Sequence, residues 1–390
     1  MPAARQGLCR GGRGRPVAGS LRDRRAVSID TLICAATRFE AARQIGELPA
    51  GHPSARLHGH GFVAQVRCAL PALWAEFEGG EVQQLQQELS AAVAPLDHHL
   101  LNEQVALPTD ANLARWIARQ PDLPAAAQLR LQSTPRRGVD VDATGHAHLW
   151  RRHVFQAAHV LPRVPAGHKC GRMHGHGFEV VLHADQDAAS GSTAISHDDI
   201  DAAWAPLQQQ LDHACLNDLT GLTNPTSELL SSWIWARLKP VLPSLSWVTV
   251  YETASCGALF DGERYRVWKE LTLDSALHLN GAPEGSAMRR LHGHTYTLRL
   301  HLSAPLDALM GWTIDFGDVK TLFDPIFKQL DHQPLHEIAD LADCDTASVA
   351  RWVFEHARLQ LPQLDRVDLY ETDGCGAIVS VHGAVLALPV

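Results

Sequence analysis

The sequence lacks the features that mark several classes of protein. Its eight cysteines form no Cys-x-x-Cys pair, and a histidine-rich chain of 390 residues is poor material for a disulfide scaffold. No apolar run approaches the roughly 18 to 20 residues that cross a bilayer. Basic residues are outnumbered, with 34 Lys and Arg against 43 Asp and Glu. We therefore expect no membrane segment, no nucleic-acid partner and a reducing, cytoplasmic location.

The first 27 residues are rich in Arg and Gly and lack the apolar core of a secretory signal. A transit peptide or a basic arm would have this composition, and so would a disordered tail or an overextended start. We favour a disordered basic tail, because the segment has too little apolar surface to form a core. The remaining chain has enough apolar material for roughly two or three domains.

Three landmarks recur with a period of about 117 residues, which indicates tandem duplication. His-Gly-His begins at residues 58, 174 and 292, Leu-Asp-His begins at 96, 211 and 330, and a tryptophan in a helical pattern stands at 116, 233 and 352. We divide the chain into a first module (28–145), a middle module (146–268) and a third module (269–390). The polar segment TPRRGVDVDATGHAH is the first linker.

The middle module shows the secondary structure most clearly. Short β-branched and aromatic stretches predict strands at 153–160, 177–185, 246–253 and 257–260. Between them, apolar residues at helical spacing predict helices within 197–213 and 227–238. The unit is therefore ββααββ, of the α+β class. An antiparallel sheet is expected because the strands come in adjacent pairs.

The His-Gly-His triplet suits a metal site. Residues i and i+2 of a strand face the same side, so His174 and His176 project together while Gly175 faces away. His159, at the end of the neighbouring apolar stretch, can supply a third imidazole. Three histidines without a fourth protein ligand are typical of a zinc site whose fourth coordination position is open to water or substrate. Packed or surface histidines would explain one such triplet, but they explain three copies in register poorly.

Other side chains near the triplet can carry chemistry. Cys170 is either a fourth ligand that closes a structural zinc site or a free thiol that acts as a base beside the metal. Asp212 can orient an imidazole and His213 can carry a proton, although a single Leu-Asp-His at a helix end is usually a solvated turn. Glu252, at a strand terminus, can accept the N–H groups of a flat heterocycle.

These residues carry a resemblance to the pterin synthase family, and within it to the bacterial 6-carboxytetrahydropterin synthases. The middle module is similar through FQAAHVLPRVPAGHKCGRMHGHGFEV, LDHACLND, NPTSELLSSWIWARLKPVLP and YET, which span nearly all of residues 153–262. The other modules resemble the family more weakly, through HGH, LDH and, in the third, GWTIDF and YET. One departure is that the family's Gly-(Trp/Met)-x-x-Asp-Phe appears in the middle module as GSTAISHDD.

The resemblance implies a role for each matching residue. His159, His174 and His176 would bind Zn²⁺, Cys170 would be the general base, Asp212 and His213 would relay protons, and Glu252 and Glu228 would hold the pterin. The implied substrate is 7,8-dihydroneopterin triphosphate, converted to 6-carboxytetrahydropterin with release of acetaldehyde and triphosphate, in queuosine and 7-deazapurine biosynthesis. The alternatives are a 6-pyruvoyltetrahydropterin synthase or a related epimerase or aldolase, and a non-catalytic protein that binds pterin or zinc.

The resemblance also implies an architecture. Family members with one module assemble as rings of three, commonly stacked in pairs, with active sites at subunit boundaries. Three fused modules are therefore expected to form a pseudo-trimeric β-barrel of tunnelling-fold (T-fold) units with helices outside. The chain would act as a monomer or as a homodimer of such rings.

The outer modules have lost parts of the site. In the first, Arg43, Ser54, Ala111 and Ser133 stand where the middle module has His159, Cys170, Glu228 and Glu252. The third keeps Glu371 and three histidines, expected to hold a second metal, but has Met288 for the cysteine and Ala347 for Glu228; these histidines are His278, His292 and His294. The pairs Asp97-His98 and Asp331-His332 persist, either because a neighbour lends its pair to Cys170 or because the pair fixes a turn in every copy.

Overall fold

The computed structural model describes residues 28–49, 51–186, 195–341 and 343–381, so the basic segment at 1–27 lies outside the described residues. The modules repeat one ββααββ unit. The first contains β1 (Ile29–Arg43), β2 (His58–Cys68), α1 (Glu81–Val93), α2 (Asp110–Ala118), β3 (Gln128–Thr134) and β4 (Arg137–Val141). The middle contains β5 (Ala147–His159), β6 (His174–Asp185), α3 (His197–Leu211), the short β7 (Ala214–Cys215), α4 (Ser227–Leu238), β8 (Leu245–Thr253) and β9 (Cys256–Phe260). The third contains β10 (Tyr265–Leu277), β11 (His292–Ser303), α5 (Phe316–Leu330), α6 (Thr346–Arg358), β12 (Leu364–Thr372) and β13 (Cys375–Val381).

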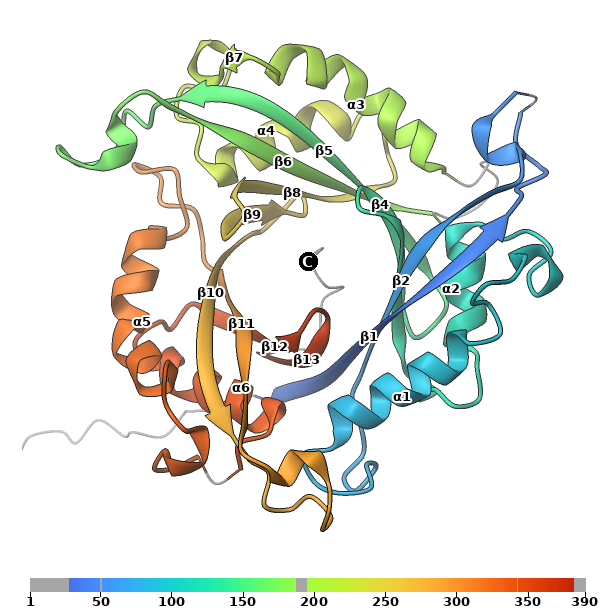
Figure 1. Ribbon diagram of the computed structural model, residues 1–390. Coiled ribbons are helices and arrows are strands. Elements are labelled where there is room, and N and C mark those ends of the chain that lie inside the picture. Colours follow the sequence, from blue (N-terminus) through green and yellow to red (C-terminus); the bar gives the residue numbers. More distant parts are fainter. Residues whose placement is uncertain (1–27, 50, 187–194, 342, 382–390) are drawn as a thin grey trace, which may run out of the picture.

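The three sheets join into one closed barrel with the helices outside, as Figure 1 shows. Its long strands follow the order β4-β3-β2-β1-β13-β12-β11-β10-β9-β8-β6-β5, and β4 pairs with β5 to complete the ring. All pairs between long strands are antiparallel. Closure satisfies the backbone groups that separate four-stranded sheets would leave at their edges. The predicted pseudo-trimeric barrel is therefore confirmed.

Because side chains alternate between the two faces of each strand, they form two separate buried layers. One side of each strand packs under the helices, where Ile200, Trp204, Leu207 and Leu211 of α3 are buried, as their helical spacing predicts. The other side faces the barrel interior and includes Trp150 and Trp268. Charged side chains also lie there, paired as hydrogen-bonded Arg130–Asp140 and Arg366–Asp368. Pairing is what permits these charges to be buried.

Two strands begin earlier than predicted. β5 starts at Ala147 rather than residue 153, because its first residues pair with β4 across a hairpin. β6 starts at His174, so the whole triplet is extended backbone. Among the described residues, no helix is both long and apolar enough to span a membrane.

Candidate active site between the middle and third modules

The middle module brings its three predicted histidines together. His159 ends β5 and is paired with His174, the first residue of β6, while His176 lies opposite Ala157. The ring centroids are 4.5 Å apart for His159 and His174, 5.2 Å for His159 and His176, and 5.0 Å for His174 and His176. A Cβ at Gly175 would lie 3.0 Å from the carbonyl oxygen of Ala157. A side chain at this position would therefore crowd the strand pairing that sets this triangle.

Hydrogen bonds orient two of the rings. Nδ1 of His159 donates to the carbonyl oxygen of Pro225 at 3.0 Å, and Nδ1 of His174 donates to that of Arg172 at 2.7 Å. Each bond fixes the proton on Nδ1 and leaves Nε2 as an electron-pair donor. Nε2 of His159 and of His176 is buried without a hydrogen-bond partner. Because unpartnered buried nitrogens are costly, this arrangement fits a metal ion.

Burial lowers the pKa of His159, against the opposing charge of Glu252, and so keeps the ring neutral as metal binding requires. Glu252, from the end of β8, completes the group: its ligand atoms and those of the three histidines all lie within 4.8 Å of one another. Oε1 of Glu252 is 3.4 Å from Nε2 of His176, and Oε2 accepts a hydrogen bond of 2.7 Å from Ser227. Although burial opposes ionisation, His176 and Ser227 hold the pKa of Glu252 below its ordinary value.

Cys170 lies on the same cavity but outside this group of four. Its backbone N–H donates to Nδ1 of His168 at 3.2 Å, and its carbonyl oxygen accepts from the N–H of Leu161 at 2.9 Å. Burial, with the charges of Glu252 and Asp315, raises the pKa of the Cys170 thiol. The geometry therefore favours the free thiol over the fourth metal ligand.

A cavity of about 1080 Å³ joins these groups. One wall carries Cys170, His174, His176, Glu228 and Glu252 from the middle module. The third module contributes the remaining part of the lining described here, which consists of Lys269, Trp312, Ile314, Asp315, Phe316, Gly317 and Lys320. The site therefore lies at a module boundary.

Three hydrogen bonds hold the third module's GWTIDF segment against the start of α4. Thr313 N–H donates to Oε1 of Glu228 at 2.6 Å, Thr226 Oγ1 donates to the carbonyl oxygen of Gly311 at 2.6 Å, and Asn224 donates to that of Met310 at 2.8 Å. Burial raises the pKa of Glu228 to about 7, although the Thr313 N–H opposes this shift. Glu228 can therefore accept or donate a proton near neutrality.

The sequence did not assign this segment to the Cys170 cavity. The signal was present, because GWTIDF is intact in the third module and altered in the middle one. The altered middle copy lies instead against the first module. Nε2 of His197 donates to the carbonyl oxygen of Gly138 at 3.0 Å, and Nε2 of His52 is 2.8 Å from Oδ2 of Asp198. The intact GWTIDF motif of the third module thus lies against the intact site of the middle module. The altered copy in the middle module lies against the altered site of the first module.

The first module fills its metal position with an ion pair. Nη1 of Arg43, which replaces a histidine, is 2.7 Å from Oδ1 of Asp110, and Ser133 donates to Oδ2 at 2.6 Å. Although burial opposes it, Arg43 lowers the pKa of Asp110 to about 2. The guanidinium is itself buried and also donates to the carbonyl oxygen of Pro108. A fixed protein cation therefore occupies the place of a metal in this module.

The third module does not assemble its three histidines. The rings of His292 and His294 lie edge to face with their centroids 5.4 Å apart, but the ring centroid of His278 lies 4.0 Å from that of His336. These three do not form a group of mutually close ligand atoms in the described part of the chain. Glu371 is bound by Gln83 and Thr346. The expectation of a second metal at His278, His292 and His294 therefore gains no support from this geometry.

The three Asp-His pairs occupy equivalent turns within their own modules. The histidine N–H donates at 2.6 Å to the first strand, from His98 to Glu40, from His213 to Gln156 and from His332 to Asp274. The same strand residues donate their N–H groups back to Asp97, Asp212 and Asp331. The histidines adopt φ of 57° to 58°, and their side chains are 76% to 79% exposed. The pairs thus brace a strained turn in every copy.

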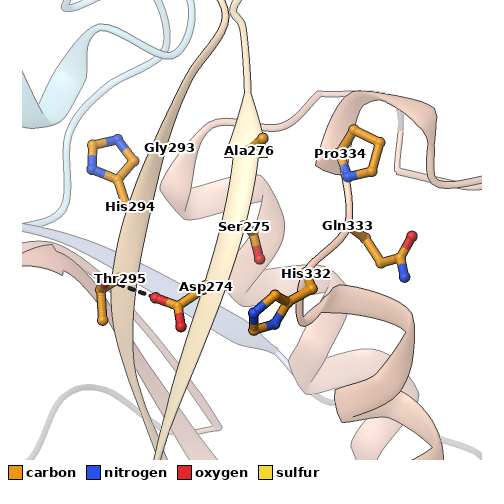
Figure 2. Close-up of a pocket in the computed structure, with 9 residues that line it drawn as sticks. All are labelled: Asp274, Ser275, Ala276, Gly293, His294, Thr295, His332, Gln333 and Pro334. Carbon is orange, nitrogen blue, oxygen red and sulfur yellow. Dashed lines mark hydrogen bonds between the residues drawn. The ribbon is translucent and has the colours of Figure 1, made fainter.

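Within one chain, the expectation that a neighbouring module's pair completes the Cys170 cavity gains no support from this arrangement. None of the Asp-His residues is among its lining residues in the described ranges. His213 lines a separate shallow groove that shares only His176 with the cavity. Figure 2 shows the equivalent groove of the third module, where His332 lies beside Asp274 and Thr295 donates to that carboxylate at 2.6 Å. Within one chain, the third module supplies Trp312–Lys320 instead.

Comparison with known proteins agrees with the repeated unit. The profile of the 6-pyruvoyl tetrahydropterin synthase family matches residues 32–142, 148–263 and 266–381. The 6-carboxy-5,6,7,8-tetrahydropterin synthase of Synechocystis sp. is 36% identical over 123 residues, which cover 30% of this chain and 94% of that protein. The dihydroneopterin monophosphate aldolase of Pyrococcus furiosus is 34% identical over 89 residues, covering 22% of this chain and 75% of that protein.

Solved structures include similar chains. The 6-pyruvoyl tetrahydropterin synthase of Caenorhabditis elegans aligns with 29% of this chain and 92% of its own length, at 18% identity and a TM-score of 0.27. Uricase from Arthrobacter globiformis aligns with 56% of this chain and 80% of its own length, at 9% identity and a TM-score of 0.32.

Proposed function

Because the chain belongs to the 6-pyruvoyl tetrahydropterin synthase family, with three copies in tandem, we propose that it is a zinc-dependent 6-carboxytetrahydropterin synthase with one active site. The substrate would be 7,8-dihydroneopterin triphosphate, and the pathway that of queuosine and other 7-deazapurines. The single observation that carries this proposal is the cavity lined by Cys170, Glu228, Glu252 and two of the three clustered histidines, with the third, His159, buried directly behind them. In the described residues, neither outer module presents that set.

His159, His174 and His176 would hold the zinc ion through Nε2. Two of these nitrogens are otherwise unpartnered, and backbone carbonyl oxygens fix the tautomer of His159 and His174. A zinc ion held there supplies Lewis acidity toward the hydroxyl groups of the substrate's side chain. Neutral imidazoles leave the site a net positive charge once the metal is bound.

Cys170 would remove the proton from the carbon next to those hydroxyls. Burial raises the pKa of its thiol, so Cys170 needs positive charge nearby to ionise at neutral pH. The histidine cluster on the same cavity is where that charge would be placed. Asp212 and His213 remain the proposed relay pair, although their groove meets the cavity only at His176.

Glu252 and Glu228 would hold the flat heterocycle. Both carboxylates line the cavity, and each already uses one oxygen within the protein, toward Ser227 and Thr313 respectively. The cationic side chains around the cavity suit the triphosphate, and they are Lys169, Arg172, Lys269 and Lys320. The ring substituents would thus lie between the middle and third modules.

Incubation of the purified chain with dihydroneopterin triphosphate, followed by mass analysis of the products, tests the proposal. We expect 6-carboxytetrahydropterin with equimolar acetaldehyde and triphosphate. A pyruvoyl product or a cleaved aldol product would assign a different reaction to the same cavity. Absence of any turnover in metal-loaded protein would support the non-catalytic binding role.

The seven described cysteines form no disulfide bonds, which supports a cytoplasmic location for the enzyme.

We propose that the working unit is one ring or two stacked rings, since closure of the barrel needs no second chain. Sedimentation of the purified protein distinguishes the two.

A further inference from the structure

A second group of metal-binding side chains lies where the first module is joined to the middle one. His146 lies in the turn between β4 and β5, His148 is the second residue of β5, and Asp185 is the last residue of β6, so much of the expected linker at 134–148 is strand. The ligand atoms of these three side chains all lie within 4.8 Å of one another. None of them belongs to the active-site cavity.

The hairpin between β4 and β5 fixes the backbone of this group. Oδ1 of Asp142 accepts hydrogen bonds from the N–H of Thr144 at 2.8 Å and from that of His146 at 3.0 Å. Gly145 occupies the turn with φ of +87°, a conformation that favours glycine. His148 is then paired directly with Asp185 across β5 and β6. Backbone pairing therefore brings the three side chains together without depending on a mobile loop.

The side-chain geometry is that of a partly preformed site. Nε2 of His146 lies 2.7 Å from Oδ1 of Asp185, and the two imidazole rings are 4.7 Å apart at 65°. Nδ1 of His148 is buried without a hydrogen-bond partner. His146 and Asp185 are 31% and 30% exposed, so a cation could reach the group from solvent.

The ring of His148 contacts a neighbouring aromatic side chain. The ring centroid of His148 lies 5.6 Å from that of Trp247, and His183 stacks on the same indole with a centroid distance of 4.3 Å. Both ring nitrogens of His183 are buried without partners.

We propose that His146, His148 and Asp185 bind a divalent transition-metal ion at the boundary of the first two modules. Two imidazoles and one carboxylate form a donor set suited to Zn²⁺, Co²⁺ or Ni²⁺, with water completing the coordination. The ion would connect the β4–β5 hairpin to the end of β6, where the first and middle sheets meet. Its role is structural, because binding to the folded ring alone stabilises that ring.

This site is independent of the catalytic one. His148 and His159 stand at opposite ends of β5, roughly 36 Å apart at the rise of an extended strand. The site also depends on the linker that fuses the modules, whereas the active site depends on the boundary between the middle and third modules. Loss of one should therefore leave the other intact.

The test uses the full chain with His174→Ala and His332→Ala, which remove one ligand each from the two other groups of mutually close metal-binding side chains in the described residues, the active-site cluster and Asp274–Asp331–His332. Equilibrium dialysis with Co²⁺, monitored by its visible absorption, should show one bound ion per chain. Adding His148→Ala or Asp185→Asn should weaken binding by more than the roughly 10- to 100-fold that follows loss of an outer-shell partner. His356→Ala, a half-buried histidine on α6, serves as the matched control and should leave binding unchanged.

A second measurement separates loss of metal from loss of fold. Zn²⁺ should raise the unfolding temperature of the parent double variant, and this rise should disappear with His148→Ala while circular dichroism stays the same. Retention of full Co²⁺ stoichiometry in both His148→Ala and Asp185→Asn would overturn the proposal. So would failure of the parent double variant to bind Co²⁺ at all, which would leave His146 and Asp185 as an ion pair only.

Discussion

Thr313 of the third module and Glu228 of the middle module are joined by a hydrogen bond of 2.6 Å from the backbone N–H of Thr313 to Oε1 of Glu228. Glu228 is buried in the first turn of α4. Together with Glu252, it lines the active-site cavity. Because of this bond, residues of two modules form the proposed substrate pocket together. It also explains how a carboxyl group with a raised pKa is retained at the boundary.

Glu228→Gln should change how stability depends on pH. Burial raises the pKa of Glu228 from 4.5 to about 7, so its folded-state protonation stabilises the chain below pH 4.5, and this contribution is lost as pH rises to about 7. The variant keeps the acceptor for Thr313 and removes the titration. Relative to the wild-type chain, it should gain up to about 3 kcal/mol between pH 4.5 and 7.5. Urea unfolding at several pH values measures the difference, and parallel curves would refute the raised pKa.

Cys170→Ala should abolish turnover while the middle module keeps its zinc, because Cys170 lies outside the cluster of three histidines and Glu252. Metal content by mass spectrometry and product formation should be measured on the same sample. Cys215→Ala, in the separate shallow groove, is the control and should retain activity. Loss of metal in Cys170→Ala would instead make Cys170 a ligand.

Lys320→Ala should raise KM for the triphosphate substrate by about two- to five-fold and leave kcat unchanged, as expected for an exposed charge that contributes uniform binding. The effect should shrink at high salt. Lys328→Ala on the same helix is the matched control, since Lys328 is 73% exposed and pairs with Asp324. Equal KM values for the two variants would place the triphosphate elsewhere.

Arg43→Ala should lower the free energy of unfolding by about 3 to 5 kcal/mol, because it leaves Asp110 buried without its partner. Arg43→His with Asp110→Ser gives the first module the residues found at these positions in the middle one. This double variant should lose much less stability. Chemical unfolding of both variants decides the matter, and equal losses would mean that packing rather than charge explains the effect.

The repeated unit and the cluster of three histidines could be predicted from the sequence, for the following physical reasons. The period of the repeat fixes how many modules exist, and the two-residue period of a strand puts His174 and His176 on one side. Their partner His159 follows from antiparallel pairing of adjacent strands, which the structure confirms. Gly175 was likewise expected to face away, and the carbonyl oxygen of Ala157 occupies that side.

The sequence does not show which modules around the ring share an active site. A repeat period does not say which module follows which in space, so the segment at 311–320 could not be assigned to Cys170. The Asp-His pairs allowed two interpretations for a related reason. Their persistence suggested a lent catalytic group, whereas reciprocal hydrogen bonds to the adjacent strand provide a structural reason for each pair.

The pairing of β1 with β13 has a consequence for the order of folding. Ile29 is opposite Val381, so this contact joins strands near the two ends of the described chain, while β4–β5 and β9–β10 join neighbours in sequence. Contacts of such long sequence separation form slowly. During synthesis β1 must wait, with one side unpaired, until β13 leaves the ribosome. Any slowing of that final step would lengthen the time in which β1 can pair with the wrong chain.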